Sequence, residues 1–177
     1  MAPKAIPRDA GFTLVELMVT LVVVSVFLFY AVPSFTQLYR NNQMTNQANS
    51  ILGAVQLARA EAVHLGKGTA VCGSSDGSAC DGSWGTGWIV FVDDSGNNTA
   101  PPTANDILRT ATLKTGIDVA TAGLFRFTPQ GTRWPEGTAG QQSLKTVTIK
   151  RSTCGNEKAR AITVEPGGRA SAEEVAC

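Results

Sequence analysis

Charged residues and histidine are scarce in this 177-residue chain. Asp, Glu, Lys and Arg make up 16% of it, well below the usual quarter, and 43% of the residues are hydrophobic, which argues against a disordered polar protein. One histidine and four cysteines leave little from which to build a catalytic metal site. Fifteen Lys and Arg stand against fourteen Asp and Glu, so no whole-chain basic field attracts nucleic acid. The glycines follow no fixed period, which excludes a repeat protein.

The hydrophobic residues gather near the N-terminus. Residues 12–32 form a run of 21 residues whose only charged member is Glu16. At about 1.5 Å per residue, a helix of this length spans the roughly 30 Å hydrocarbon core of a bilayer. Lys4 and Arg8 outnumber Asp9 in the segment before it, which favours a cytoplasmic N-terminus and an exported C-terminal part. The sequence therefore predicts a membrane segment joined to a soluble domain.

Two features of this run need an explanation. A cleaved secretory signal peptide is an alternative to an anchor, but the run ends at Tyr30-Ala31-Val32-Pro33 and continues into a helix-compatible segment. Glu16 is unusual because a carboxylate at the centre of a membrane helix costs about 2.5–3.5 kcal/mol, and less near the interface. Either this side chain only reaches the headgroups, or it has a function.

The segment Gly11-Phe12-Thr13-Leu14-Val15-Glu16 resembles the class III signal of type IV pilins and type II secretion pseudopilins. In that family a membrane peptidase cuts after the glycine and methylates the new N-terminal residue. The resemblance implies that residues 1–11 are a leader ending at Gly11 and that Phe12 is the methylated N-terminus. Glu16 is then the fifth mature residue, where the family keeps an acid that pairs with the N-terminal amine of a neighbouring subunit and sets subunit register. Pro33 falls where many pilins have a helix-kinking proline.

Beyond Pro33 the sequence stays compatible with a helix to about Leu65. Apolar residues repeat every three to four positions there, at Ile51, Leu52, Val55, Ala58, Ala62 and Leu65. Gly66-Lys67-Gly68 supplies the stop signal. We therefore expect a helix over residues 12–65, about 80 Å long, which is apolar all round over residues 12–32 and amphipathic over residues 33–66. His64, near its end, is expected to be exposed or to cap the helix.

From residue 67 onward the pattern changes to strands and turns. Strand-like segments lie at residues 69–72, 87–92, 107–109, 124–128, 147–150 and 161–164. The second of these is almost continuously apolar, which predicts a strand covered on both faces. The predicted fold class is therefore α+β, with a long N-terminal helix packed on a β-rich, mostly antiparallel domain of residues 67–177.

Several of these segments resemble the GspH/FimT branch of the pseudopilins. They are Ala58-Arg59-Ala60-Glu61-Ala62-Val63, Gly87-Trp88-Ile89-Val90-Phe91-Val92-Asp93, Ile107-Leu108-Arg109, Phe127-Thr128-Pro129-Gln130-Gly131, Ile162-Thr163-Val164 and Gly168-Arg169. This resemblance implies the type IV pilin fold.

Four cysteines allow three pairings. Because each closes a local loop, we expect the disulfides Cys72–Cys80 and Cys154–Cys177. A zinc site made of all four cysteines is the alternative, although neither pair has the short spacing of a zinc ribbon. Disulfides need an oxidising compartment, which the predicted topology supplies in the periplasm.

The resemblance implies a structural protein that is a substrate of the prepilin peptidase and not itself an enzyme, and the sequence indicates neither a cofactor nor a metal site. We expect a minor type IV pilin, FimU-like, that helps prime pilus assembly and is incorporated into pili serving twitching motility and adhesion. Its partners are then other minor pilins, the major pilin and the inner-membrane assembly platform. Before assembly it is expected to be a single-pass inner-membrane protein with a periplasmic C-terminal domain.

Two alternatives stay open. A minor pseudopilin of a type II secretion machine shares every feature above. A DNA-binding minor pilin for natural transformation has a basic Gly-Arg-x-Arg element, which Gly168-Arg169-Ala170-Ser171 matches only in part, and Arg169 is then the DNA contact. Residues 145–177 hold six basic and four acidic residues, a small excess for binding phosphates. The C-terminal pair of cysteines resembles the FimU-like subunits more than the DNA-binding ones.

Overall fold

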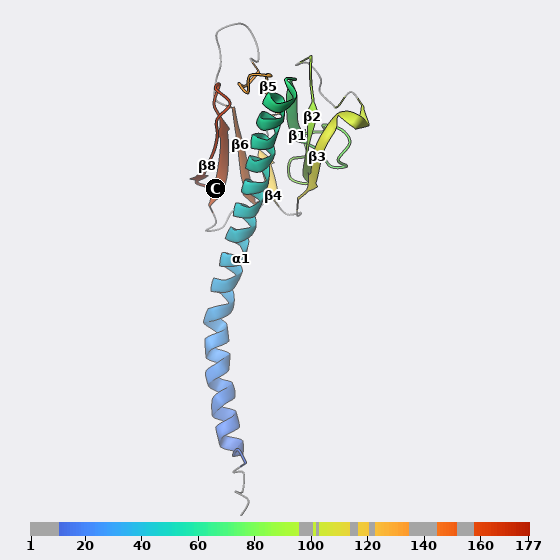
Figure 1. Cartoon of the computed structure of the whole chain (residues 1–177). Coiled ribbons are helices and arrows are strands. Elements are labelled where there is room, and N and C mark those ends of the chain that lie inside the picture. The colour runs from blue at the N-terminus through green and yellow to red at the C-terminus, as the bar shows by residue number, and fades with distance from the viewer. Residues whose placement is uncertain are drawn as a thin grey trace, which may run out of the picture. The chain divides into compact units, whose positions relative to one another are not determined.

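The chain contains one long helix and eight strands among the residues described. The computed structural model describes residues 11–95, 101, 103–113, 117–120, 123–134, 145–151 and 158–177. The chain divides into two compact units, Met1–Tyr39 and Arg40–Cys177. Helix α1 (Leu14–Leu65) has residues in both units (Figure 1). Each unit is described by itself below.

The first unit is the N-terminal part of α1. The helix begins at Leu14, two residues later than expected, because Thr13 caps it: the Thr13 Oγ1 accepts the Glu16 backbone N–H at 3.2 Å. An 18-residue window of α1 has a mean hydropathy of 2.4 and none of it is buried, so by length and composition this helix is able to cross a membrane. A helix that is apolar all round and uncovered in its own chain needs lipid or other helices around it.

The helix ends where the sequence predicts. Gly66 adopts φ 63°, a left-handed conformation that glycine enters without strain, and the Lys67 N–H donates to the Ala62 carbonyl at 3.2 Å. This is the Schellman arrangement that closes many helices. His64 is exposed, as expected, and its Nδ1 lies 3.7 Å from the Glu61 Oε2.

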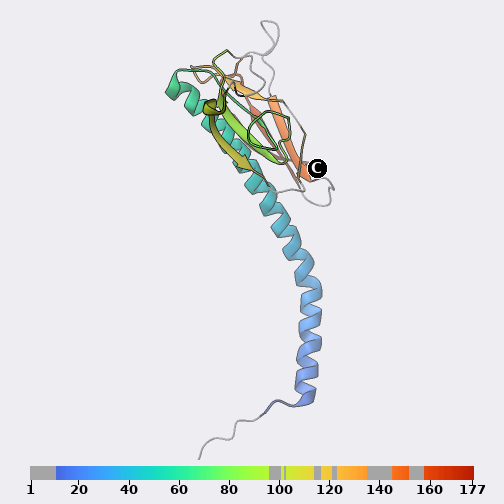
Figure 2. The same ribbon diagram turned by 90° about the vertical axis from the view of Figure 1, so that its right-hand side faces the viewer.

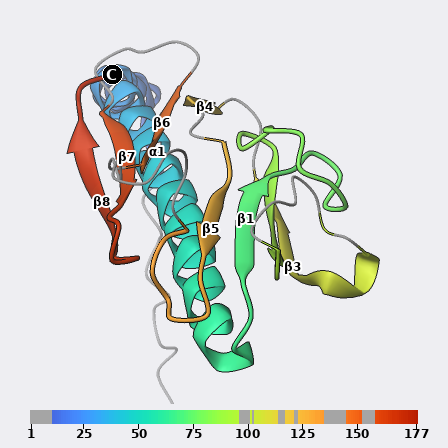
Figure 3. The same ribbon diagram turned by 90° about the horizontal axis from the view of Figure 1, so that it is seen from above.

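The second unit contains two antiparallel sheets of four strands each. The first has the order β3-β2-β1-β5 and consists of Ile107–Thr112, Gly87–Val92, Thr69–Gly73 and Phe125–Phe127. The second has the order β4-β6-β7-β8 and consists of Ile117–Ala120, Lys145–Arg151, Ala159–Val164 and Ala170–Val175. Figures 1 and 3 show the C-terminal part of α1 running along the strands, and Figure 2 shows it as a separate layer beside them.

One hydrophobic core joins that part of α1 to both sheets. The helix contributes Met44, Ala48, Ile51, Ala54, Val55, Ala58 and Ala62. The first sheet contributes Val71, Trp88, Val90, Phe125 and Phe127, and the second contributes Val147, Ile149, Ile162 and Val164. Burial of each large side chain is worth about 1.5–3 kcal/mol, which fixes the apolar stripe of the helix against the strands. Leu65, the last member of the expected stripe, is 41% exposed because the core ends at Ala62.

The far face of the first sheet is also covered, as the continuous apolar run of β2 predicts. Ala70, Cys72, Ile89 and Phe91 are buried there, with Cys80 and Leu124 packed against them. The Cys72–Cys80 disulfide holds the segment that follows β1 over this face and confirms the expected pairing. A zinc site using these two cysteines is thereby ruled out.

Strands β4 and β8 are elements that the sequence pattern does not reveal. In β8 only Ala170, Ser171 and Val175 are even partly buried, so the strand lacks the apolar alternation that marks a half-buried one. Cys177 is disulfide-bonded, and Cys154 lies outside the described residues, so the expected Cys154–Cys177 pairing stays a prediction.

Candidate functional site

The N-terminal segment holds the residues expected to be processed. Gly11, Phe12 and Thr13 precede the helix and form no regular secondary structure, and the Phe12 side chain is 85% exposed. Glu16 lies in the first turn of α1, where the partial positive charge of the helix terminus favours a carboxylate. Among the residues described, none forms an ion pair with Glu16. Helix α1 continues through Pro33, and the expected kink there stays a prediction.

In the second unit, Arg59 joins the helix to two loops that are far away in the sequence. Its Nε donates to the Gly131 carbonyl at 2.9 Å and its Nη2 donates to the Gly167 carbonyl at 3.3 Å. Gly131 follows β5, and Gly167 lies in the turn between β7 and β8. We call Arg59, Gly131 and Gly167 the Arg59 clasp.

Two glycines make this close approach feasible. Gly131 and Gly168 have φ of 75° and 81°, a region that other residues rarely enter. A Cβ on Gly168 would collide with the Gly131 carbonyl oxygen and would lie 3.0 Å from the Arg59 Nε. Gly131 and Gly168 lie in two of the segments that resemble the pseudopilins. Because these glycines have no Cβ, the two turns can approach Arg59 and each other closely enough to form the clasp.

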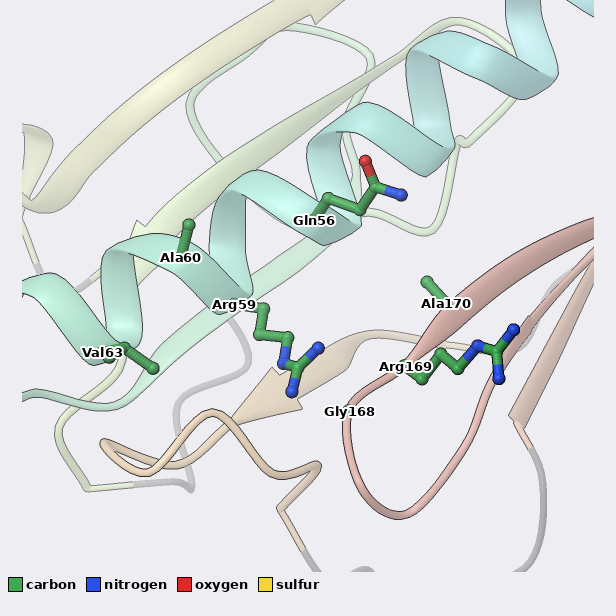
Figure 4. Close-up of a pocket in the computed structure, with 7 residues that line it drawn as sticks. All are labelled: Gln56, Arg59, Ala60, Val63, Gly168, Arg169 and Ala170. Atoms are coloured by element: carbon green, nitrogen blue, oxygen red, sulfur yellow. The ribbon is translucent and has the colours of Figure 1, made fainter.

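Beside the clasp lies an open groove of about 630 Å³. Seven residues line it: Gln56, Arg59, Ala60, Val63, Gly168, Arg169 and Ala170 (Figure 4). The Arg59 side chain extends from the helix toward the turn that carries Gly168 and Arg169 (Figure 4). The groove therefore brings Arg169, the one sequence-predicted site residue of the second unit outside the cysteines, onto the same surface as Arg59.

A buried ion pair holds the first sheet together. Asp93, directly after β2, has a side chain that is 0% exposed, and its Oδ2 accepts the Arg126 Nε at 2.9 Å. The Asp93 backbone N–H also donates to the Gly68 carbonyl at 2.8 Å. Asp93 lies in a segment that resembles the pseudopilins, and the pair indicates that this residue has a structural role.

The loop closed by Cys72–Cys80 is organised by two aspartates. The Ser78 hydroxyl and amide and the Ala79 amide donate to Asp76 and lower its pKa well below the usual range. The Ser75 hydroxyl and the Ser83 amide lower the pKa of Asp81 to about 2. Both carboxylates are therefore charged at every physiological pH and serve as acceptors for their own loop.

Several basic residues of the C-terminal part already have partners. Glu174 accepts Lys158 at 2.9 Å and Arg160 at 2.6 Å, and these two contacts, Lys158 first, lower the pKa of Glu174. Arg160 also donates to the Thr45 Oγ1 on α1 at 3.2 Å. Lys145 donates to the Leu124 carbonyl at 2.5 Å and lies over the Phe125 ring, 5.6 Å from its centroid. Several of the basic side chains in residues 145–177 therefore already contact groups of the same chain, which reduces the small positive excess available to a ligand.

Comparison with known proteins bears on both parts of the chain. Residues 47–168 match the family model of the type II transport protein GspH, and residues 6–32 match that of the prokaryotic N-terminal methylation motif. The chain belongs to the GspH family. Members of this family are structural, pilin-like subunits that are anchored by an apolar N-terminal helix and assemble with other pilins. No curated protein matches the chain significantly.

Solved structures extend this family assignment to the fold. A crystal structure of the type IV minor pilin FimU of Pseudomonas aeruginosa is 22% identical, with a TM-score of 0.55, and the match covers 76% of this GspH-family chain and 90% of FimU. A second crystal form of FimU is 24% identical, with a TM-score of 0.51, covering 73% and 91%. The long helix followed by antiparallel sheets is therefore the type IV pilin fold, as expected from the sequence.

The interactions that sequence reasoning missed in this GspH-family protein are the Arg59 clasp and the Asp93–Arg126 pair. The clasp joins residues 72 and 108 positions apart, and the ion pair joins residues 33 apart. Their only sequence signal is the presence of Arg59, Gly131, Gly168 and Asp93 in the segments that resemble the family.

Proposed function

We propose that this GspH-family protein is a minor pilin, a structural subunit that helps prime the assembly of type IV pili and is incorporated into them. One observation carries the proposal: an exposed, apolar helix start whose single acid, Glu16, has no ion-pair partner among the residues described. A subunit of this kind is complete only when other helices surround it.

Processing is the first step of the proposed role. A prepilin peptidase would cut between Gly11 and Phe12 and methylate the Phe12 amine. Gly11 has no atom within 4 Å of the place where a Cβ would stand, and residues 11–13 are exposed and lie outside the helix, so this backbone is accessible to a protease. The match to the N-terminal methylation motif supports this step.

Glu16 then sets the register between neighbouring subunits. In an apolar filament core an isolated carboxylate and an isolated amine are each costly, and each offsets the burial penalty of the other when they meet. The amine of Phe12 on a neighbouring subunit is the proposed partner of Glu16. A one-turn slip would separate the two charges, so the pair selects one alignment.

The proposed location follows from the same features. Before assembly, the N-terminal helix would lie in the inner membrane and the second unit in the periplasm, where the Cys72–Cys80 disulfide can form. The proposed partners are other minor pilins, the major pilin, the prepilin peptidase and the assembly platform. FimU, to which the fold is similar, is described as a type IV minor pilin, which supports a pilus subunit, whereas the family description, type II transport protein GspH, supports the alternative of a secretion pseudopilin.

A deletion strain tests the role directly. We expect deletion of the gene to reduce sheared surface pili, and the wild-type copy to restore them. Glu16→Gln should fail to restore piliation although the protein accumulates in the membrane. Glu61→Gln, the same chemical change at the surface pair with His64, is the matched control and should restore it.

Three readouts on the same strains separate the alternatives. Normal piliation with lost transformation would refute the priming role in favour of DNA capture, and Arg169 would be the next residue to test. Normal piliation with lost protein secretion would refute it in favour of a secretion pseudopilin. Restoration of pili by Glu16→Gln would refute the register mechanism.

A further inference from the structure

The groove beside the Arg59 clasp carries two guanidinium groups and no described acid that neutralises them. Arg59 donates only to backbone carbonyls, and Arg169 is exposed and forms no ion pair with a described residue. The nearest acids along the chain are Glu61, which faces His64, and Glu165 and Glu173, neither of which lines the groove. Glu174 is occupied by Lys158 and Arg160. The groove is therefore electropositive while the whole chain has a formal net charge of only +1.

Arg59 is fixed in position before any ligand arrives. Its bonds to the Gly131 and Gly167 carbonyls use two of the five N–H groups of a guanidinium, which leaves three without a partner among the described residues. A side chain held in this way loses little rotamer freedom on binding. A planar guanidinium with free donors matches the geometry of a carboxylate.

The rest of the lining indicates the class of ligand. Ala60, Val63 and Ala170 are apolar, and Gln56 adds an amide (Figure 4). A volume of about 630 Å³ accommodates a few side chains. None of the described lining residues is aromatic, so the groove offers no surface on which a nucleic-acid base would stack, and two cations make a short track for a phosphate backbone.

We propose that this groove binds an acidic segment of a neighbouring pilin subunit, with one carboxylate on Arg59, a second on Arg169, whose side chain extends away from Arg59 (Figure 4), and an adjacent apolar side chain lying against Ala60, Val63 and Ala170. The inference rests on the proposed function for the identity of the partner. It adds a specific contact between the second units of neighbouring subunits to the helix packing of the filament core. Charge complementarity of this kind selects the partner more than it adds affinity.

Binding of a model peptide tests the groove without a pilus. The mature full-length protein in detergent micelles is titrated into a fluorescein-labelled peptide of sequence Gly-Leu-Glu-Val-Glu-Leu, and binding is followed by fluorescence anisotropy. We expect the peptide to bind and its Gln-for-Glu counterpart to bind at least about tenfold more weakly, the effect of losing one charge-assisted contact. Arg169→Gln should weaken binding of the acidic peptide by a similar factor. Arg109→Gln, which removes an exposed arginine of β3, is the matched control and should have no effect.

Several outcomes would overturn the proposal. Equal affinity for the two peptides, no binding, or an unchanged affinity of Arg169→Gln each contradict it. A labelled DNA duplex that binds more tightly than the acidic peptide, and does so through Arg169, would assign the groove to nucleic acid instead. A normal pilus count in the deletion strain would refute the proposed function but not the measured carboxylate binding. Equal binding of the two peptides by a protein that restores piliation would refute only the proposed binding site in the groove.

Discussion

Removal of the Arg126 guanidinium should destabilise the second unit more than any surface substitution. Arg126→Met keeps most of the apolar stem but removes the guanidinium that contacts the carboxylate of Asp93, whose side chain is 0% exposed. Breaking a buried pair from one side costs about 3–5 kcal/mol, because an uncompensated charge stays in a low dielectric. The Ser95 hydroxyl donates to Asp93 at 3.2 Å and supplies part of the lost stabilisation, so we expect about 3 kcal/mol.

The position of the pair explains why the loss affects the whole sheet. In the order β3-β2-β1-β5, Asp93 follows β2 and Arg126 lies in β5, so their contact bridges β1. Arg126 is paired with Ala70 in the register of β1 and β5, and the Asp93 N–H donates to the Gly68 carbonyl just before β1. The ion pair thus holds three adjacent strands in one alignment.

Thermal unfolding of the mature protein in detergent, followed by circular dichroism and tryptophan fluorescence, measures the effect. At roughly 3 °C per kcal/mol for a unit of this size, Arg126→Met should lower the Tm by about 10 °C. Arg109→Met, the matched control on the exposed strand β3, should change the free energy of unfolding by less than about 0.5 kcal/mol. The double variant Asp93→Asn/Arg126→Met should recover a large part of the loss, because no charge is left buried. An Arg126→Met protein as stable as Arg109→Met would refute the reasoning.

Two further predictions concern the loops. Gly168→Ala should destabilise the second unit by about 2 kcal/mol, because the new Cβ would collide with the Gly131 carbonyl and the backbone has a φ of 81°. Gly167→Ala is the control, because nothing lies within 4 Å of its new Cβ. Equal Tm values for the two variants would contradict the clasp. The Cys72–Cys80 loop should be indifferent to pH from neutrality down to about 4 and loosen as the pH falls toward 2, because a lowered folded pKa gives stability that is present above the unfolded pKa and lost as pH falls through the folded one. A carboxyl-carbon NMR titration of Asp81 with its midpoint near 4 in place of about 2 would show that the serine contacts are not formed.

The sequence predicted those features of the fold that depend on residues close together in the chain. The three-to-four-residue repeat and Gly66 define the end of α1, and the continuous apolar run predicts the doubly covered strand β2. The Cys72–Cys80 pairing could be inferred because the two cysteines lie only eight residues apart across a turn. In each case the structure is determined by contacts between residues near one another in the chain.

The elements that escaped prediction depend on distant partners. Strand β8 carries Glu173 and Glu174 at exposed positions and is held by pairing with β7 and by the contacts of Glu174 with Lys158 and Arg160. The Arg59 clasp depends on two glycine turns that follow different strands. A side-chain periodicity cannot reveal an interaction whose partners are brought together only by the sheet topology.

The segments that resemble the pseudopilins therefore encode two separate properties. In the proposed role, those at the N-terminus, around Gly11 and Glu16, act in processing and in packing among other helices, and nothing in the second unit is needed to explain them. Three of those in the second unit, which carry Arg59, Gly131 and Gly168, meet at the Arg59 guanidinium, which is held by the backbone carbonyls of Gly131 and Gly167 and has three further N–H donors. In the proposed contact, Arg59 supplies a cation fixed by the fold, and the exposed residues around the groove determine which neighbour the subunit accepts. Exchange of Gln56 and Arg169 between family members should therefore transfer partner choice without altering stability, because both side chains are exposed and neither is part of the clasp.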